Sequence, residues 1–503
     1  MRGFLAVAAV AGDVLRPSFQ GRRSAAAAVS VLGLLLAISA TPAAATLGEV
    51  GVAGDQAPAT LQGPEFALAL DRGLVGNFGG YGGQFNQHVY AKISGPPPDL
   101  PNLETKVLAL EPQFVRIFFN TSEWTLPDRM ESFVRTVALA QRARAEINIT
   151  WQGSTFEFAM RNMSRFADVL EGLLKDGAID RLWVTLFNEP NSTQRTLAEY
   201  EQVYRLLDSE LRDRGVRGRV HFMGGDLVRS TTGPSQADWF RYMAGRMGDL
   251  LDAWSVHVRW DFWDSDKIDQ RLRSEVRTIF STIPAEQRRP LYVTEFGVRG
   301  LGTFEGEPSF EPGFWPDGTG MSATNAAAFQ QAWFMIRAAQ LGFTATVKWD
   351  VYPAKYDAGT QDHSALGPGA DGWPTRPVYR VLQLMTVTTK PRGGSIVDVV
   401  PSSGADPSKL LTAYVSPARD VTILGLDTDG GAIATTSHTP VSYSVGGLPS
   451  NTLFRLLLWN GDGSGGNADV GFLDSGPAGV LEFSVPLDAV FALTNTPIMS
   501  LPW

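Results

Sequence analysis

Cysteine is absent from this 503-residue chain. That absence excludes disulfides, metal sites built on thiolates, and thiol nucleophiles. Positively charged residues are also outnumbered. The chain has 43 lysine and arginine residues against 52 aspartate and glutamate residues, so its net charge is −9. Nucleic-acid binding needs a basic face and is therefore disfavoured. Acidic substrates are disfavoured too, unless a local basic cleft receives them.

Several functional motifs are missing as well. Gly79–Gly83 follows an apolar run but lacks the G-x-G-x-x-G spacing of a dinucleotide fingerprint, so we interpret it as a turn that approaches a substrate cleft. No H-E-x-x-H or comparable cluster occurs, and we expect neither a metal nor a cofactor. After the N-terminal region, no run is long and apolar enough to span a membrane.

The N-terminal region has the pattern of an export signal. Arg22 and Arg23 precede an apolar run at 25–40, and Ala43–Ala45 offer a cleavage site. We therefore predict a signal peptide at 1–45, a linker at 46–64 and a secreted protein, free or held at the cell surface. An uncleaved membrane anchor is the alternative, and the arginine pair leaves general and twin-arginine export both open.

The central region predicts a (β/α)₈ barrel over 65–385. Apolar runs alternate with helical patterns, such as the three-and-four spacing of Tyr200, Val203, Tyr204 and Leu207. This alternation, repeated eight times, is typical of the barrel, and an open doubly wound sheet is the competing architecture. The eight runs are 74–78, 114–119, 147–151, 182–187, 220–223, 253–258, 291–294 and 344–349.

The last 118 residues follow a different pattern. From 386 to 503, helical spacing gives way to short apolar runs separated by turn residues, as at 427–431 and 461–467. Seven such strands in so short a span predict a β-sandwich.

Two carboxylates stand where apolar strands stop. Glu189 follows the run 182–187, and Glu295 follows the run 291–294. Burying a charge there is costly unless it is paired. Because a barrel of this kind has its active site at the C-terminal ends of its strands, we expect the two carboxyls to face each other at its mouth. A separation of about 5–5.5 Å is what a retaining glycoside hydrolase requires. Other residues near the strand ends are Arg116, Trp151, Gln152, Asn188, His257, Trp349 and Asp350.

This set resembles the clan of retaining glycoside hydrolases with (β/α)₈ barrels, clan A, and is most similar to families 39 and 5. In that clan an Asn-Glu pair ends the fourth strand and a second Glu ends the seventh; here these are Asn188-Glu189-Pro190 and Glu295. An Arg on the second strand, a His on the sixth and a Trp on the eighth match Arg116, His257 and Trp349. One departure is Arg259, where many members carry a Tyr that orients the nucleophile.

The resemblance implies that Glu189 is the acid/base and Glu295 the nucleophile. A glycosidic oxygen leaves poorly, so Glu189 must be protonated and its pKa should be raised. Asn188 would donate to the sugar 2-hydroxyl, and Trp349 and Trp151 would stack on the sugar. The substrate implied is a β-linked oligo- or polysaccharide.

Other interpretations remain open from the sequence. An α-L-arabinofuranosidase or a uronidase of the same clan is the enzymatic alternative, and a non-catalytic carbohydrate-binding surface protein is the other. A single strand-end Glu is more often a structural ion-pair partner, but two in matched positions favour catalysis. Likewise His257, Trp349 and Arg116 would each, if taken alone, fit a packed barrel interior.

Overall fold

A computed structural model describes residues 63–91, 99–152, 155–176, 179–192, 195–229, 233–260, 263–298, 321–353, 363–430, 439–460 and 467–498. The predicted signal peptide and nearly all of the predicted linker lie outside these residues, so both stay predictions. In the part of the chain that is described, no helix has the length and apolarity needed to cross a membrane.

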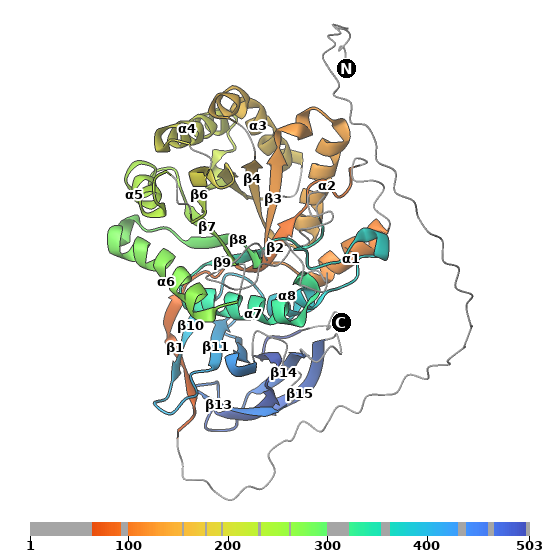
Figure 1. Cartoon of the computed structure of the whole chain (residues 1–503), viewed down its shortest axis with the longest axis vertical. Helices are drawn as coiled ribbons and strands as arrows, with labels where there is room; N and C mark the ends of the chain where they lie inside the picture. The colour runs from red at the N-terminus through yellow and green to blue at the C-terminus, as the bar shows by residue number, and fades with distance from the viewer. Residues whose placement is uncertain are drawn as a thin grey trace, which may run out of the picture. The chain divides into compact units, whose positions relative to one another are not determined.

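Eight parallel strands close into a barrel, which confirms the predicted (β/α)₈ architecture. In barrel order the strands are β2 (Gly80–Phe85), β3 (Phe114–Asn120), β4 (Glu146–Gln152), β5 (Leu182–Leu186), β6 (Val220–Leu227), β7 (Ala253–Trp260), β8 (Leu291–Val298) and β9 (Ala345–Lys348). A helix follows each strand and packs outside the barrel (Figure 1). The helices are α1 (Leu100–Leu110), α2 (Pro127–Arg142), α3 (Phe156–Asp176), α4 (Leu197–Asp213), α5 (Gln236–Arg246), α6 (Ser265–Thr282), α7 (Asn325–Gln340) and α8 (Pro377–Thr388).

The first barrel strand differs from the predicted one. The run 74–78 is not a barrel strand, because its first residues end β1 (Phe66–Val75), which belongs to the second sheet. The glycine-rich segment that we interpreted as a turn forms β2 instead. A Cβ on Gly82 would overlap the carbonyl oxygen of Phe114, so glycine permits the close approach of β2 and β3. Glycine is depleted in strands, and for that reason the sequence pattern favoured a turn.

The second sheet is β-sandwich-like and nearly closed. Its strand order is β15-β14-β17-β12-β11-β10-β1-β13-β16. The strands besides β1 are β10 (Ser395–Pro401), β11 (Lys409–Val415), β12 (Val421–Asp427), β13 (Pro440–Gly446), β14 (Leu453–Asn460), β15 (Asn467–Asp474), β16 (Leu481–Pro486) and β17 (Ala489–Thr494). The predicted boundary between the two domains, at 385/386, falls inside α8. The second sheet also includes β1, whose residues belong to the start of the range predicted for the barrel.

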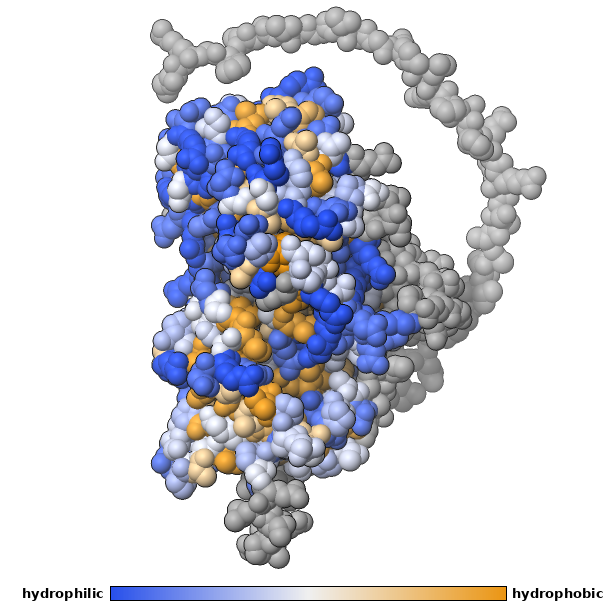
Figure 2. Space-filling model, turned by 90° about the vertical axis from the view of Figure 1, so that its left-hand side faces the viewer, coloured by the Kyte–Doolittle hydropathy of each residue, from blue (hydrophilic) through white to orange (hydrophobic). Residues whose placement is uncertain are grey.

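Alternating residues of this sheet serve two cores. Ile423 of β12 packs in the sheet's own interior with Tyr443 and Phe491, whereas its neighbour Leu424 joins the large core shared with the barrel helices. Hydrogen bonds reinforce the contact with those helices: Gln340 Nε2 of α7 donates to the carbonyl of Leu411 at 2.5 Å. On the face drawn in Figure 2, hydrophilic side chains (blue) predominate, and apolar side chains (orange) reach the surface in patches between them.

Candidate active site

A cleft of about 550 Å³ opens at the C-terminal ends of the barrel strands. The N-terminal half of the barrel interior is filled instead by an apolar cluster that includes Phe114, Met223, Tyr292 and Val347. The ionisable residues of the cleft wall are Glu189, Glu295, His257, Arg229, Arg259 and Arg271. Asn188, Gln152, Trp349, Phe118 and Val228 complete the described lining.

Glu189 reaches the cleft through a sharp bend after β5. The strand ends at Leu186, and both Phe187 (φ 68°) and Glu189 (φ 52°) take left-handed backbone conformations that cost non-glycine residues free energy. Such strain is held in place by the surrounding structure and is common at functional sites. The Glu189 side chain is 29% exposed, so a ligand in the cleft can meet it.

Glu295 lies within β8 and is only 2% exposed. A buried carboxylate needs positive partners, and two guanidinium groups provide them. Arg116 Nη1 donates to Glu295 Oε2 at 2.8 Å, and Arg259 forms an ion pair with Oε1. The charge on Glu295 is therefore compensated from two sides.

Arg116 organises the floor of the cleft. It projects from β3 into the barrel and is completely buried. Its donors reach across the barrel to other strands, so the side chain fixes several groups at once. The guanidinium of Arg116 donates hydrogen bonds to Thr150 Oγ1 (3.0 Å), Gln84 Oε1 (3.1 Å), Asn188 Oδ1 (2.7 Å), Glu295 Oε2 (2.8 Å) and Asp226 Oδ2.

Asp226 is a residue that the sequence analysis missed. It lies near the end of β6, is fully buried, and accepts hydrogen bonds from Ser255 Oγ (2.8 Å) and Thr294 Oγ1 (2.5 Å). Burial alone would raise the pKa of this carboxyl, but the charges of Arg116 and His257 outweigh burial and hold the pKa well below its usual range. A signal was present, because a carboxylate interrupts the apolar end of a strand here just as it does at Glu295.

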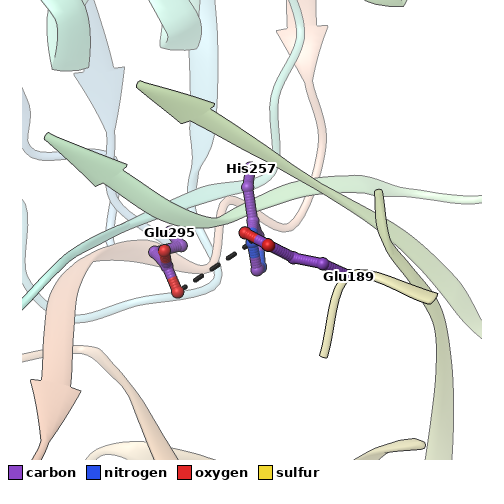
Figure 3. A group of neighbouring side chains, drawn as sticks. All are labelled: Glu189, His257 and Glu295. Carbon is purple, nitrogen blue, oxygen red and sulfur yellow. Dashed lines mark hydrogen bonds and ion pairs between the residues drawn. The ribbon is translucent and has the colours of Figure 1, made fainter. Parts of the chain in front are cut away.

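His257 of β7 lies among three carboxylates. Its Nδ1 is 3.0 Å from Glu189 Oε1 and 3.9 Å from Glu295 Oε2, and its Nε2 is 3.4 Å from Asp226 Oδ1. Figure 3 shows the two glutamates extending toward the imidazole from two sides. Carboxylate oxygens of Glu189 and Glu295 approach within 4.8 Å of each other.

The pKa of Glu189 is opposite to the predicted direction. Burial raises it, but the hydrogen bond and charge of His257, with the charges of Arg259 and Arg116, outweigh burial, so the pKa lies below its ordinary value. The sequence-based expectation of a raised pKa followed from the acid role of Glu189. The acid role says nothing of the imidazole of His257 or the guanidinium groups of Arg259 and Arg116, which lower the pKa of Glu189.

Glu189, His257 and Glu295 also have the composition of a metal site, with one ligand atom from each within 4.8 Å of the others. However, Arg116 and Arg259 already occupy the oxygens of Glu295. A metal ion here would have two guanidinium charges beside its ligand, so the donor set fits a cation poorly.

The two predicted stacking tryptophans have different environments. Trp151 is completely buried and packs against Phe119, Trp124 and Phe166 outside the barrel wall, so it is not in the cleft lining and the predicted sugar contact is wrong. Successive side chains of a strand point to opposite faces. The preceding Thr150 points into the barrel, where it contacts Arg116, so Trp151 points outward.

Trp349 does line the cleft, but other groups already lie on it. The Cζ of Arg259 is 3.4 Å from the Trp349 ring centroid, and the His363 ring stacks on the indole at 4.9 Å. Arg259 thus connects Glu295 to Trp349. No tyrosine is among the described residues of the cleft lining, and at the position of the missing orienting Tyr it is Arg259 that contacts the carboxylate of Glu295.

No protein-family model matches the chain, and no curated protein matches its sequence. Solved structures do match. An α-L-arabinofuranosidase from Thermotoga maritima superposes with a TM-score of 0.60 at 9% identity, over 86% of this chain and 99% of that one. A family 51 α-L-arabinofuranosidase from Bifidobacterium longum superposes with a TM-score of 0.58 at 14% identity, over 86% of this chain and 100% of that one.

A family 39 β-xylosidase from Caulobacter crescentus gives a TM-score of 0.54 at 11% identity, over 86% of this chain and 99% of that one. At such low identity, the likeness concerns the fold. The chain has the architecture of clan A glycoside hydrolases of families 39 and 51, a (β/α)₈ barrel joined to a β-sandwich-like domain.

Proposed function

We propose that this protein is a retaining glycoside hydrolase that cleaves a β-linked oligo- or polysaccharide, with Glu189 as acid/base and Glu295 as nucleophile. The observation that carries the proposal is the approach of their carboxylate oxygens to within 4.8 Å at the mouth of the barrel. Retaining enzymes place their carboxyls about 5–5.5 Å apart, whereas inverting enzymes leave about 6.5–9.5 Å for a water molecule.

In the first step, a carboxylate oxygen of Glu295 attacks the anomeric carbon and forms an ester bond with it. The glycosidic bond breaks, and the leaving oxygen departs as an alcohol with the proton of Glu189. In the second step, Glu189 takes a proton from water, and the water oxygen attacks the anomeric carbon. The ester bond breaks, so Glu295 returns as a carboxylate and Glu189 as an acid.

The surrounding side chains suit these steps. Arg116 and Arg259 compensate the charge of the nucleophile before attack. Asn188 accepts from Arg116 through Oδ1, which leaves its Nδ2 to donate to the sugar 2-hydroxyl. Such a bond strengthens in the oxocarbenium-like transition state.

A panel of aryl glycosides tests the proposal. Turnover is expected for at least one β-glycoside, and NMR should show a first-formed product with retained configuration. An inverted product would contradict double displacement. Absence of turnover, with sugar binding intact, would instead favour the non-catalytic carbohydrate-binding alternative.

An α-L-arabinofuranosidase is the second candidate, favoured by the two arabinofuranosidases among the matching structures. An aryl α-L-arabinofuranoside in the same panel separates the two, because only one of these glycosides should be turned over efficiently. Export is part of our proposal as well. Mass spectrometry of secreted protein should find a mature N-terminus near Thr46, and an intact N-terminus on a membrane-bound form would contradict cleavage.

A further inference from the structure

The candidate active site is more basic than the protein that contains it. The chain carries a net charge of −9, yet three arginines, Arg229, Arg259 and Arg271, line the cleft beside the two glutamates. Behind them, Arg116 and Asp226 offset each other. When Glu189 holds the proton that its proposed role requires, Glu295 is the one anionic side chain left in the described lining.

Resting on the function proposed above, we infer that the sugar bound against Glu295 is anionic, a uronate or a sulfated sugar, and that Arg259 recognises its negative group. Arg259 projects from β7, is 18% exposed on its side chain, and lies between Glu295 and Trp349. It therefore occupies the space that a sugar must enter to be attacked by Glu295.

The position of Arg259 makes the charge of the sugar decisive. A sugar that reaches Glu295 has to separate Arg259 from the carboxylate. A neutral sugar would break the ion pair of this guanidinium with Glu295 in a partly buried cleft and offer no charge in its place, which is costly. An anionic sugar offers a replacement, since guanidinium binds carboxylate and sulfate groups through paired N–H donors. Binding such a substrate would free Glu295 for attack at the same time.

The other two arginines support this placement. Arg271, from α6, donates Nη1 to the carbonyl of Arg259 at 2.6 Å and Nη2 to the carbonyl of His257 at 3.2 Å. It thus holds a second positive charge next to the backbone that carries Arg259. Arg229 is exposed two residues after β6, and its charge acts on the cleft and on the buried carboxyl of Glu275.

Matched substrate pairs test the inference. Methylumbelliferyl glycosides in the gluco, galacto and manno series would be compared as the uronide, the parent hexoside and the 6-sulfate, in both anomers. An anionic member should show a kcat/KM on the order of 100-fold above its neutral partner, the scale expected for a desolvated charge pair. The uronide and sulfate arms then identify which anion is recognised.

The variant Arg259→Gln should collapse this preference to within about tenfold, chiefly by loss on the anionic member. Arg212→Gln serves as the matched control, because it removes an exposed arginine from α4, outside the cleft. Binding of the free uronic acids, sugar 6-sulfates and parent sugars, measured by calorimetry at two salt concentrations, gives a readout that needs no turnover.

The outcomes separate the two proposals. The inference is overturned if neutral glycosides are turned over as well as anionic ones, or if Arg259→Gln leaves the anionic preference intact. In either case the proposed hydrolase function stands. Arg259-dependent binding of an anionic sugar without any turnover supports the inference and overturns the hydrolase. Failure of every anionic member to bind overturns the inference whatever the activity.

Discussion

His257 Nδ1 lies 3.0 Å from Glu189 Oε1, and this contact links the proposed acid/base to the buried charge network of the barrel. On its other side the imidazole faces the buried carboxylate of Asp226. Glu189 therefore contacts an imidazole that is itself held against a buried carboxylate whose pKa lies well below its usual range. The acidity of Glu189 depends on this arrangement as well as on its own exposure.

The first prediction concerns the pH profile. The pKa of Glu189 is held below its ordinary value, chiefly because His257 opposes the effect of burial. Since kcat/KM requires protonated Glu189 in the free enzyme, it should fall as pH rises through that low pKa, and activity should be greatest in the acid range. His257→Gln should raise the pKa and move this limb to higher pH.

His221→Gln provides the control, because it removes a histidine that pairs with Asp252 and lies outside the cleft. Stopped assays on a good aryl substrate between pH 3 and 9 would measure kcat/KM for the parent and for both variants, and so locate the pH at which it falls. A limb that stays in place in His257→Gln, or that moves equally in both variants, would contradict the proposed coupling.

The second prediction concerns the nucleophile. Glu295→Gly should lose hydrolysis, because no covalent intermediate can form. Azide or formate placed in the vacated space should restore cleavage of an activated aryl glycoside and give a product of inverted configuration, which NMR identifies. Retained configuration in the rescued product would show that Glu295 has another role.

The third prediction concerns the acid/base. Glu189→Ala should lose about 10²–10⁴-fold on substrates whose leaving group needs a proton. It should keep much of its first-step rate on dinitrophenyl glycosides, whose leaving group departs unprotonated, and azide should speed the second step with retained configuration. Pre-steady-state bursts would separate the steps. Equal losses on both kinds of substrate would argue against an acid role.

The fourth prediction concerns Asp226, which touches both Arg116 and His257 but does not line the cleft. Asp226→Asn removes the carboxylate that pairs with the guanidinium of Arg116 and faces His257 in a fully buried site. The free energy of unfolding should fall by about 3–5 kcal/mol, and kcat should fall with KM nearly unchanged. The control Asp252→Asn removes a half-exposed carboxylate at the other end of the barrel and should have a smaller effect on kcat.

The sequence predicted the barrel because seven of its eight strands are continuous apolar runs, which strands buried on both faces require. It failed at β2, where packing against Phe114 demands glycine and the apolar signal disappears. Strand-end position also identified Glu189, Glu295, Arg116 and His257 as neighbours. It could not distinguish inward from outward side chains at a strand end, and for that reason Trp151 was misplaced.

The electrostatics of the cleft were harder to predict than its members. The whole-chain charge disfavoured acidic substrates, because a total cannot show that Arg229, Arg259 and Arg271 converge on one cleft. Arg259 was visible in the sequence only as a departure from a family pattern. Its ion pair with Glu295 depends on the register that sets β7 beside β8, where His257 is paired with Glu295.

The fifth prediction concerns Glu275, which lies on α6 one turn after Arg271 and is 4% exposed. Burial raises its pKa from the ordinary 4.5 to about 7, despite the opposing charge of Arg271. The folded protein therefore binds more protons than the unfolded chain between these two values. In that window the free energy of unfolding should fall as pH rises, and the loss attributable to Glu275 should reach about 3 kcal/mol above pH 7.

Glu275→Gln removes the ionisable group but keeps its shape. Relative to the parent protein, its free energy of unfolding in urea should rise by about 3 kcal/mol between pH 4.5 and pH 8.5. Glu131→Gln, at an exposed position on α2, makes the same chemical change outside the core and serves as the control. A flat difference for Glu275→Gln would mean that this carboxyl gains enough compensation from Arg271 and Gln236 to ionise in the folded protein as readily as in water.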